Sequence, residues 1–340
     1  MAKKPKLTHR QKRQVSTNRS LRLSKTPIEH DNLGTAQAGI VVGRFGKHAN
    51  VEDTSGTTHK CHIRRTIDSV VCGDSVIFCP SISKEPRDLG VIEIVHDRKT
   101  VLTRPDFYDG VKPIAANIDQ IIIVSSIVPT LSPHIIDRYL VACEDVQIQP
   151  VIVINKMELL DEEDREMVID LLTVYHDIGY KVLLTSCVTG EGIADLAQLL
   201  TDNISVFVGQ SGVGKSSLVN QLLPDADEIV GDVSQNSGLG THTTTTAKLL
   251  HFTEGGDVID SPGVREFSLW HLPDEQITRG FIEFRDYLGG CKFRDCKHGD
   301  DPGCLIRDAV DNGIIDEARY ESYHKIIDAM EEKRPSYSKS

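Results

Sequence analysis

The chain has 340 residues, of which 39% are hydrophobic and 26% charged, and its formal net charge at pH 7 is −12. This length allows two or three domains, each with its own core. No apolar run approaches the roughly 20 residues that span a bilayer, and the first residues lack the apolar segment of a secretion signal. We therefore expect a cytoplasmic protein and exclude a membrane protein.

The charge is unevenly distributed along the chain. Residues 1–28 contain nine basic side chains and no acidic one, whereas the remaining residues carry 29 basic against 50 acidic side chains, a net charge of −21. A basic segment on an acidic body is typical of nucleic-acid contact through phosphates; a solvated tail without a partner is the alternative. Low hydrophobicity and high charge predict that residues 1–35 form an arm that is disordered when free.

Short β-like runs follow the arm, at 39–45, 59–63, 74–78 and 90–95, with turn signals such as 53–56 and 72–74 between them. Closely spaced strands without helices predict a small β-barrel over residues 36–105. The oligonucleotide-binding (OB) type is the natural interpretation beside a basic arm. Arg64 and Arg65 then lie at a strand edge, where they either contact phosphate or form a solvated pair.

From residue 110 the pattern changes to that of an α/β domain, which we expect to extend to residue 274. Near-continuous apolar runs predict buried parallel strands at 120–125, 150–154, 181–185, 204–208 and 257–260. Helical spacing occupies 135–143, 161–176 and 193–200, and residues 275–340 are expected to be mostly helical. Five scattered cysteines are interpreted as small buried hydrophobic residues: Cys61, Cys72, Cys79, Cys143 and Cys187.

A complete phosphate-binding loop of the pattern G-x-x-x-x-G-K-S follows the run at 204–208 and precedes a helical segment. That strand–loop–helix context distinguishes it from the alternative, a glycine-rich turn before an ordinary helix. Lys215 supplies positive charge for the β- and γ-phosphates, and the Ser216 hydroxyl is a candidate Mg²⁺ ligand. The predicted phosphate contacts come from Gly209, Gln210, Ser211, Gly212, Val213, Gly214, Lys215, Ser216 and Ser217.

Asn155, Lys156, Met157 and Glu158 follow a buried strand, as the guanine-recognition pattern N-K-x-D does. A carboxylate there accepts hydrogen bonds from guanine N1–H and the N2 amine, whereas adenine leaves it unpaired. Glu158 stands where the pattern has aspartate, which keeps the chemistry but moves the carboxylate outward. The loop 185–187 matches, more weakly, the small-residue loop on the other side of the base, with Ser186 as its candidate contact.

Residues 260–263 fit D-x-x-G, in which Asp260 organises the Mg²⁺ shell and the Gly263 N–H meets the γ-phosphate. An ordinary β-turn is the alternative for these turn-forming residues. The polar segment 240–246 lies at the right distance to supply a threonine that closes on Mg²⁺ only when the γ-phosphate is present. Thr243 and Thr244 are both candidates for this role.

Val264 occupies the place of the glutamine that orients the attacking water in Ras-like enzymes, and its side chain cannot polarise water. Another group must do so, and His242 is the nearest plausible one. A solvated loop histidine is the alternative.

Near the C-terminus, Cys291, Cys296, His298 and Cys304 have the spacing C-x4-C-x-H-x5-C. Three thiolates and one imidazole are a closed tetrahedral set, which predicts a structural zinc site. Nearby basic side chains either meet RNA phosphate or are solvated: Lys292, Arg294 and Lys297.

The base-recognition segments precede the phosphate loop, which is a circular permutation of the usual order. Nearly the whole chain resembles the permuted ribosome-associated GTPases called RsgA or YjeQ. The resemblance rests on this order, on the threonine-rich segment 240–246, on residues 260–267 and on the cysteine segment. The resemblance implies a GTPase that binds the small ribosomal subunit and its rRNA, acts late in the subunit's maturation, and hydrolyses GTP slowly until the subunit stimulates it. It also implies Mg²⁺ with GTP, one zinc per chain, an OB-type barrel, and His242 as the catalytic residue.

We accordingly expect a monomer of four parts: arm 1–35, OB-type barrel 36–105, permuted GTPase domain 110–274 and zinc-binding helical domain 275–340. Lys215 and Mg²⁺, held by Ser216 and a loop threonine, neutralise the transferring phosphoryl group. We further hypothesise that the nucleotide state is transmitted to the C-terminal domain. Two rival functions are a small-molecule kinase and a nucleic-acid-binding module whose nucleotide site is structural.

Overall fold

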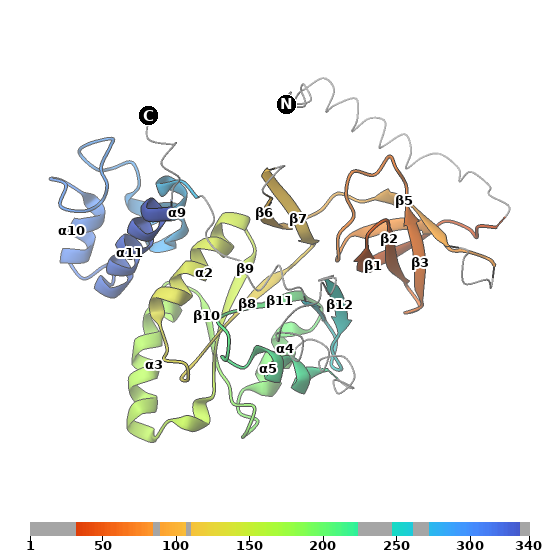
Figure 1. Cartoon of the computed structure of the whole chain (residues 1–340). Helices are drawn as coiled ribbons and strands as arrows, with labels where there is room; N and C mark the ends of the chain where they lie inside the picture. Colours follow the sequence, from red (N-terminus) through yellow and green to blue (C-terminus); the bar gives the residue numbers. More distant parts are fainter. Residues whose placement is uncertain (1–31, 84–88, 107–109, 224–246, 261–271, 334–340) are drawn as a thin grey trace. The chain divides into compact units, whose positions relative to one another are not determined.

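The computed structural model describes residues 32–83, 89–106, 110–223, 247–260 and 272–333 (Figure 1). The chain divides into two compact units: residues up to 97 except 71–73, and residues 71–73 with everything from 98 onward. The predicted arm lies outside the described ranges except for its last residues. Among the described residues, no helix is long and apolar enough to cross a membrane.

The first unit contains a five-stranded barrel. Its strands are β1 (Gln37–Phe45), β2 (His48–Asp53), β3 (Thr58–Ile63), β4 (Ser75–Cys79) and β5 (Gly90–Val95). They pair in the order β1-β2-β3-β5-β4, and β4 pairs back onto β1; the β3–β5 pair is parallel and the other pairs are antiparallel. The predicted small barrel is confirmed.

Strand β2 was not predicted from the sequence, because only its Ala49 and Val51 side chains are buried and a turn follows directly. The core of the barrel consists of small and branched side chains and one aromatic ring: Val41, Ala49, Val51, Cys61, Val70, Val76, Phe78 and Ile92. Arg64 forms an ion pair with Glu93 at 2.6 Å. Of the two arginines expected at a strand edge, this one therefore has a carboxylate partner within the barrel.

The second unit is built on a mostly parallel sheet of β8 (Gln120–Ser126), β9 (Gln149–Asn155), β10 (Lys181–Leu184), β11 (Ile204–Val208), β12 (Lys248–His251) and β13 (Asp257–Asp260). The order is β10-β9-β8-β11-β13-β12, with only β12 antiparallel. The five predicted strands are confirmed. Strand β12 and the separate pair β6 (Val101–Asp106) and β7 (Gly110–Ala116) were not predicted.

Helices cover both faces of this sheet. Helices α2 (Pro133–Val146) and α3 (Glu162–Asp177) contact β8, β9 and β10, whereas leucines of α4 (Ile193–Leu200) and α5 (Lys215–Leu222) pack with β8, β9 and β11 (Figure 1). The strands are buried on both faces, which explains their continuous apolar runs. Asp161 caps α3 by accepting a hydrogen bond from the Asp164 N–H, and three carboxylates in the first turn favour the helix dipole.

The C-terminal segment contributes α9 (Asp274–Gly280), η3 (Ile282–Tyr287), α10 (Leu305–Asp311) and α11 (Glu317–Lys333) to the second unit. Phe281 and Phe284 stack at a centroid distance of 5.1 Å, and Tyr323 meets the two rings edge-on at 5.5 and 5.3 Å. Helix α9 also packs on α2, where a Cβ at Gly280 would lie 2.6 Å from Val141 Cγ1. The helical character predicted for this segment is confirmed.

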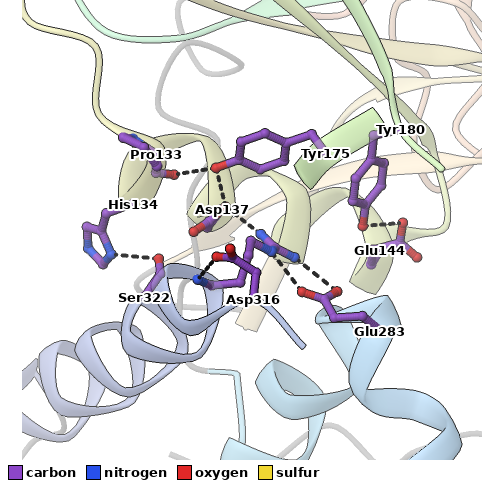
Figure 2. A network of polar contacts seen from close by, with 10 residues as sticks. Pro133, His134, Asp137, Glu144, Tyr175, Tyr180, Glu283, Asp316 and Ser322 are labelled. Carbon is purple, nitrogen blue, oxygen red and sulfur yellow. Dashed lines mark hydrogen bonds and ion pairs between the residues drawn. The ribbon is translucent and has the colours of Figure 1, made fainter. Parts of the chain in front are cut away.

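A buried ionic cluster joins α11 to α2 (Figure 2). The Arg319 guanidinium, on a side chain only 2% exposed, donates to Asp137 of α2 and to both carboxylate oxygens of Glu283, at 2.7 and 3.1 Å. The Tyr175 hydroxyl donates to the same Asp137 carboxylate at 2.8 Å. Burial alone would lower the pKa of Arg319, but Asp137 and Glu283 raise it well above its ordinary range. Arg319 is therefore charged throughout the physiological range.

Replacing Arg319 by alanine should destabilise the protein by about 3–5 kcal/mol, because it leaves the carboxylates of Asp137 and Glu283 buried without a counter-ion. Urea unfolding followed by circular dichroism measures the change. The control is Arg279→Ala, which removes an exposed pair with Glu275 one helical turn away and should cost no more than about 0.5 kcal/mol. Equal losses in the two variants would show that the cluster is not a stabilising contact.

Candidate functional site

Most of the predicted nucleotide contacts gather at one edge of the large sheet. Strands β8, β9, β10, β11 and β13 are parallel, so their carboxyl ends meet at the same edge. Asn155 ends β9, Thr185 follows β10, Gly209 follows β11 and Asp260 ends β13. In open α/β sheets this edge is where ligands bind.

The backbone of the phosphate loop requires glycine at two positions where other chain segments approach. Gly209 has φ +139°, and a Cβ there would lie 2.1 Å from the carbonyl oxygen of Val124 in β8. Gly214 has φ +94°, and a Cβ there would lie 2.3 Å from Nδ2 of Asn155. The loop is thus packed tightly against β8 and against Asn155 at the end of β9, where the predicted base-recognition segment begins.

Lys215 begins helix α5, and its ammonium group donates to the carbonyl oxygens of Gly209 and Gln210, at 2.8 and 2.5 Å. Its positive charge therefore lies inside the curve of the loop. The first N–H groups of a helix have no intrahelical partner and face its N-terminus. Together with the helix dipole, they make this end of α5 suited to an anion. Ser216 is exposed on the first turn.

Asn155 links the base-recognition segment to the phosphate loop. Its side chain is 2% exposed, its Nδ2 donates to the carbonyl oxygen of Val213 at 3.1 Å, and its Oδ1 accepts from the Thr185 hydroxyl at 3.3 Å. One buried carboxamide therefore fixes the relative positions of three segments far apart in the sequence. A buried amide is costly without such partners.

Three further residues of this set have contacts within the protein. Lys156, with φ +68°, donates through Nζ to the carbonyl oxygens of Val128 and Gly212, at 2.5 and 2.6 Å. The Ser186 hydroxyl is fully buried and accepts from the N–H groups of Val188 and Thr189, at 3.2 and 3.0 Å. The base loop is thereby held in one shape. Met157 is 1% exposed and its N–H donates to the Thr185 carbonyl oxygen.

Glu158 has a buried carboxylate oxygen, Oε2, that accepts no hydrogen bond within the described part of the chain. Burial raises the pKa of the Cys187 thiol, and the nearby Glu158 charge raises it further. A buried carboxylate oxygen without a donor is costly. This oxygen is therefore an acceptor whose hydrogen bond no described residue supplies.

Four candidate residues lie outside the described ranges: His242, Thr243, Thr244 and Gly263. The same holds for Val264. Asp260 is described at the end of β13, half-buried, in the strand that pairs in parallel with β11. The structure therefore brings the base-recognition residues and the phosphate loop together, and it places Asp260 at the same edge.

The second candidate site is the cysteine and histidine cluster. The Nδ1 atom of His298 lies 3.7, 3.6 and 3.6 Å from the sulfur atoms of Cys291, Cys296 and Cys304, and all four ligand atoms lie within 4.8 Å of one another. Tetrahedral zinc with its usual bond lengths places sulfur and nitrogen roughly 3.6 Å apart. The donor set and its geometry therefore fit a zinc ion.

Contacts of the backbone hold this loop in shape. The carbonyl oxygen of His298, at φ +60°, accepts from the Tyr320 hydroxyl at 2.6 Å and lies 3.1 Å from Nε2 of His324. The Arg307 N–H donates to the Cys304 sulfur at 3.5 Å, at the start of α10. Burial lowers the pKa of His298, which favours the neutral imidazole that a metal requires.

Residues 95–270 match the family model described as RsgA GTPase. "Small ribosomal subunit biogenesis GTPase RsgA" of Photorhabdus laumondii is 56% identical over 340 residues, covering 98% of this chain and 97% of that protein. The chain belongs to the RsgA GTPase family. RsgA of Yersinia pseudotuberculosis is similar to the same degree, with 57% identity over 339 residues and the same shares covered.

Two solved structures extend this similarity to the fold. YjeQ from Thermotoga maritima has a TM-score of 0.71 and 37% identity, over 88% of this chain and all of that one. YloQ, described as a circularly permuted GTPase, has a TM-score of 0.69 and 28% identity, over 91% of this chain and all of that one. The predicted RsgA resemblance is confirmed, and with it GTP hydrolysis as the enzyme class.

Two contacts of this RsgA family member were not foreseen from the sequence. The Val128 carbonyl oxygen holds Lys156, but a backbone acceptor leaves no side-chain signal. Tyr139 of α2 lies near the backbone of Gly209, and burial raises the pKa of its hydroxyl. Helical spacing predicted α2, yet a tyrosine in a helix is more often a packing residue than a neighbour of a phosphate loop. Cys187, expected to be buried, is half-buried beside Asn155.

Proposed function

We propose that the protein is a GTPase that binds the small ribosomal subunit and its rRNA, acts late in the subunit's maturation, and is stimulated by the subunit. The observation that carries this proposal is the single hydrogen-bonded set that joins Asn155 and Thr185 to the phosphate loop, in a chain of the RsgA family. The curated relatives are named small ribosomal subunit biogenesis GTPases.

The nucleotide is bound between the base-recognition segment and the phosphate loop. Lys215 and the first N–H groups of α5 stabilise the phosphates, and Glu158 accepts hydrogen bonds from the guanine base. Ser216 and a threonine of the loop 240–246, Thr243 or Thr244, ligate Mg²⁺. Asp260 organises the shell of that ion, and the Gly263 N–H meets the γ-phosphate.

His242 orients the attacking water. Val264 stands where Ras-like enzymes have glutamine, so the water-orienting group comes from elsewhere, and His242 lies in the loop that also carries the switch threonine. Lys215 neutralises part of the charge that develops on the transferring phosphoryl group, and Mg²⁺ held by Ser216 and a loop threonine would supply further positive charge there.

The protein contacts RNA through its basic arm and its barrel and acts as a monomer. The strand order β1-β2-β3-β5-β4, closed onto β1, supports the OB type, whose barrels bind oligonucleotides and have five strands. Its functional parts are the arm 1–35, the OB-type barrel 36–105, the permuted GTPase domain 110–274 and the zinc-binding helical domain 275–340. One structural zinc ion is held by Cys291, Cys296, His298 and Cys304.

Replacing His242 by alanine should lower subunit-stimulated GTP hydrolysis by about 10²- to 10⁴-fold and leave GTP binding unchanged, because only the water loses its orienting group. Phosphate release, with and without purified small subunits, measures turnover; calorimetry measures binding. His251→Ala, at another histidine of the second unit, is the control. Loss of GTP binding would make His242 structural, and a wild-type enzyme that small subunits do not stimulate would overturn the proposed function.

Replacing Glu158 by glutamine should weaken GTP binding roughly 10- to 150-fold, because an amide cannot accept both guanine N–H groups as a carboxylate does. Binding of GTP and ATP with Mg²⁺, measured by calorimetry, tests this expectation. Glu158→Asp retains the carboxylate and should keep the preference for GTP over ATP. Unchanged GTP affinity in the glutamine variant would contradict the assignment of Glu158 to the base.

The purified protein should contain one zinc per chain, and Cys296→Ser should lose it. Removal of the ion should lower the unfolding temperature and increase hydrogen exchange in α10 and α11, since the loop that carries the ligands is held by contacts to these helices. Cys187→Ser, outside the cluster, should retain the zinc. A chain that is fully folded without metal, with unchanged exchange in both helices, would argue against a structural role.

A further inference from the structure

An exposed aromatic side chain stands on the zinc-site loop, between the first two ligands. Phe293 is 46% exposed, although a phenylalanine is among the residues most often buried. The Lys292 ammonium lies 5.5 Å from the centroid of its ring. The ring therefore presents surface to solvent with a cation beside it.

The same loop carries three basic side chains, all exposed: Lys292, Arg294 and Lys297. In the part of the chain that the structure describes, none of them forms an ion pair. Two acidic residues of the same loop have other partners: Asp300 pairs with Arg307 at 3.3 Å, and Asp301 accepts from the N–H groups of Lys297 and Gly299. Asp295, the remaining acidic residue of this loop, is adjacent to Arg294 in the sequence and exposed. We call Lys292, Phe293, Arg294 and Lys297 the knuckle surface.

The loop that carries the knuckle surface is held in shape by local contacts. The Lys292 N–H donates to the Gly303 carbonyl oxygen at 3.1 Å, and the Cys296 N–H donates to that of Phe293 at 3.4 Å. Cys291 and Cys296, whose sulfur atoms meet at the cluster, flank the ring in sequence. A ligand that binds here does not have to order the loop, which favours affinity.

We propose that the knuckle surface binds single-stranded RNA, with an unpaired base stacked on Phe293 and the adjacent phosphates bound by Lys292, Arg294 and Lys297. An aromatic ring beside unpaired cations suits this ligand, because bases stack on aromatic side chains while basic groups bind the backbone. In double-stranded RNA the faces of the bases are stacked on neighbouring bases, so they cannot stack on the Phe293 ring. The proposal rests on the proposed function only for the source of that RNA, the small ribosomal subunit.

The test uses the zinc-loaded full chain and an unstructured oligoribonucleotide that contains one 2-aminopurine, whose fluorescence is quenched by stacking. Phe293→Leu should weaken binding roughly 5- to 150-fold and abolish the protein-dependent quenching. Phe293→Trp, which retains an aromatic face, should preserve both. Ile314→Ala, at another exposed apolar residue of this segment, is the control and should bind as the wild type does.

Charge is tested separately by replacing Lys292, Arg294 and Lys297 with glutamine. The slope of log affinity against log salt concentration should become shallower by roughly 2, since about 0.7 counterions are released per phosphate of a single strand. Lys325→Gln, at an exposed lysine of α11, should leave the slope unchanged. Zinc content, measured for every variant, establishes that the loop is intact.

The proposal is overturned if Phe293→Leu and Phe293→Trp bind and quench alike, or if the glutamine variant keeps the wild-type slope. A surface that binds protein instead of RNA would give this result. Failure of the proposed function is distinguishable, because it appears as absent stimulation of the wild-type GTPase by small subunits, whereas the oligonucleotide measurement does not involve hydrolysis. The Phe293→Leu variant should keep its hydrolysis rate in the absence of subunits.

Discussion

One buried guanidinium joins the C-terminal helices to the nucleotide-binding sheet. Arg319 of α11 is bound by carboxylates from α2 and η3, and removing the guanidinium leaves both carboxylates in the interior without a counter-ion. Two residues beyond Asp137 on α2, Tyr139 lies near the backbone of Gly209 in the phosphate loop. Helix α2 therefore lies next to both the C-terminal helices and the phosphate loop. It is a physical connection through which, by our hypothesis, the nucleotide state reaches the C-terminal segment.

The buried Asn155 joins segments that the permuted order separates along the chain. Its carboxamide binds the phosphate loop on one side and the base loop on the other, so the three segments form one site whatever their order along the chain. Gly214 permits this close approach, because any Cβ there would collide with Asn155 Nδ2. The site depends on the edge where parallel strands end, and a permutation that keeps the strands in place keeps the site.

Much of this arrangement is predictable from the sequence, and the exceptions have physical causes. The phosphate loop, the strands of the large sheet and the metal-ligand set follow local patterns: Gly209 to Ser217, continuous apolar runs, and clustered cysteines. Strand β2 was missed because only Ala49 and Val51 give it a buried side. The burial of Arg319 was not predictable, since an arginine in a helix is normally exposed and its partner Asp137 is distant in sequence. Such pairs become visible only with the tertiary structure.

The position of β8 in the sheet has a consequence for the protein during its synthesis. This strand is almost entirely buried and pairs with β9 on one side and β11 on the other. Because domains begin to fold from the N-terminus as the chain emerges, β8, β9 and β10 are available before β11, and residues 127–203 must be made in between. Until then one edge of an apolar strand has no partner, and such edges promote association between chains. The permutation therefore gives the nascent chain an interval of exposure that ends only when the strand before the phosphate loop is inserted.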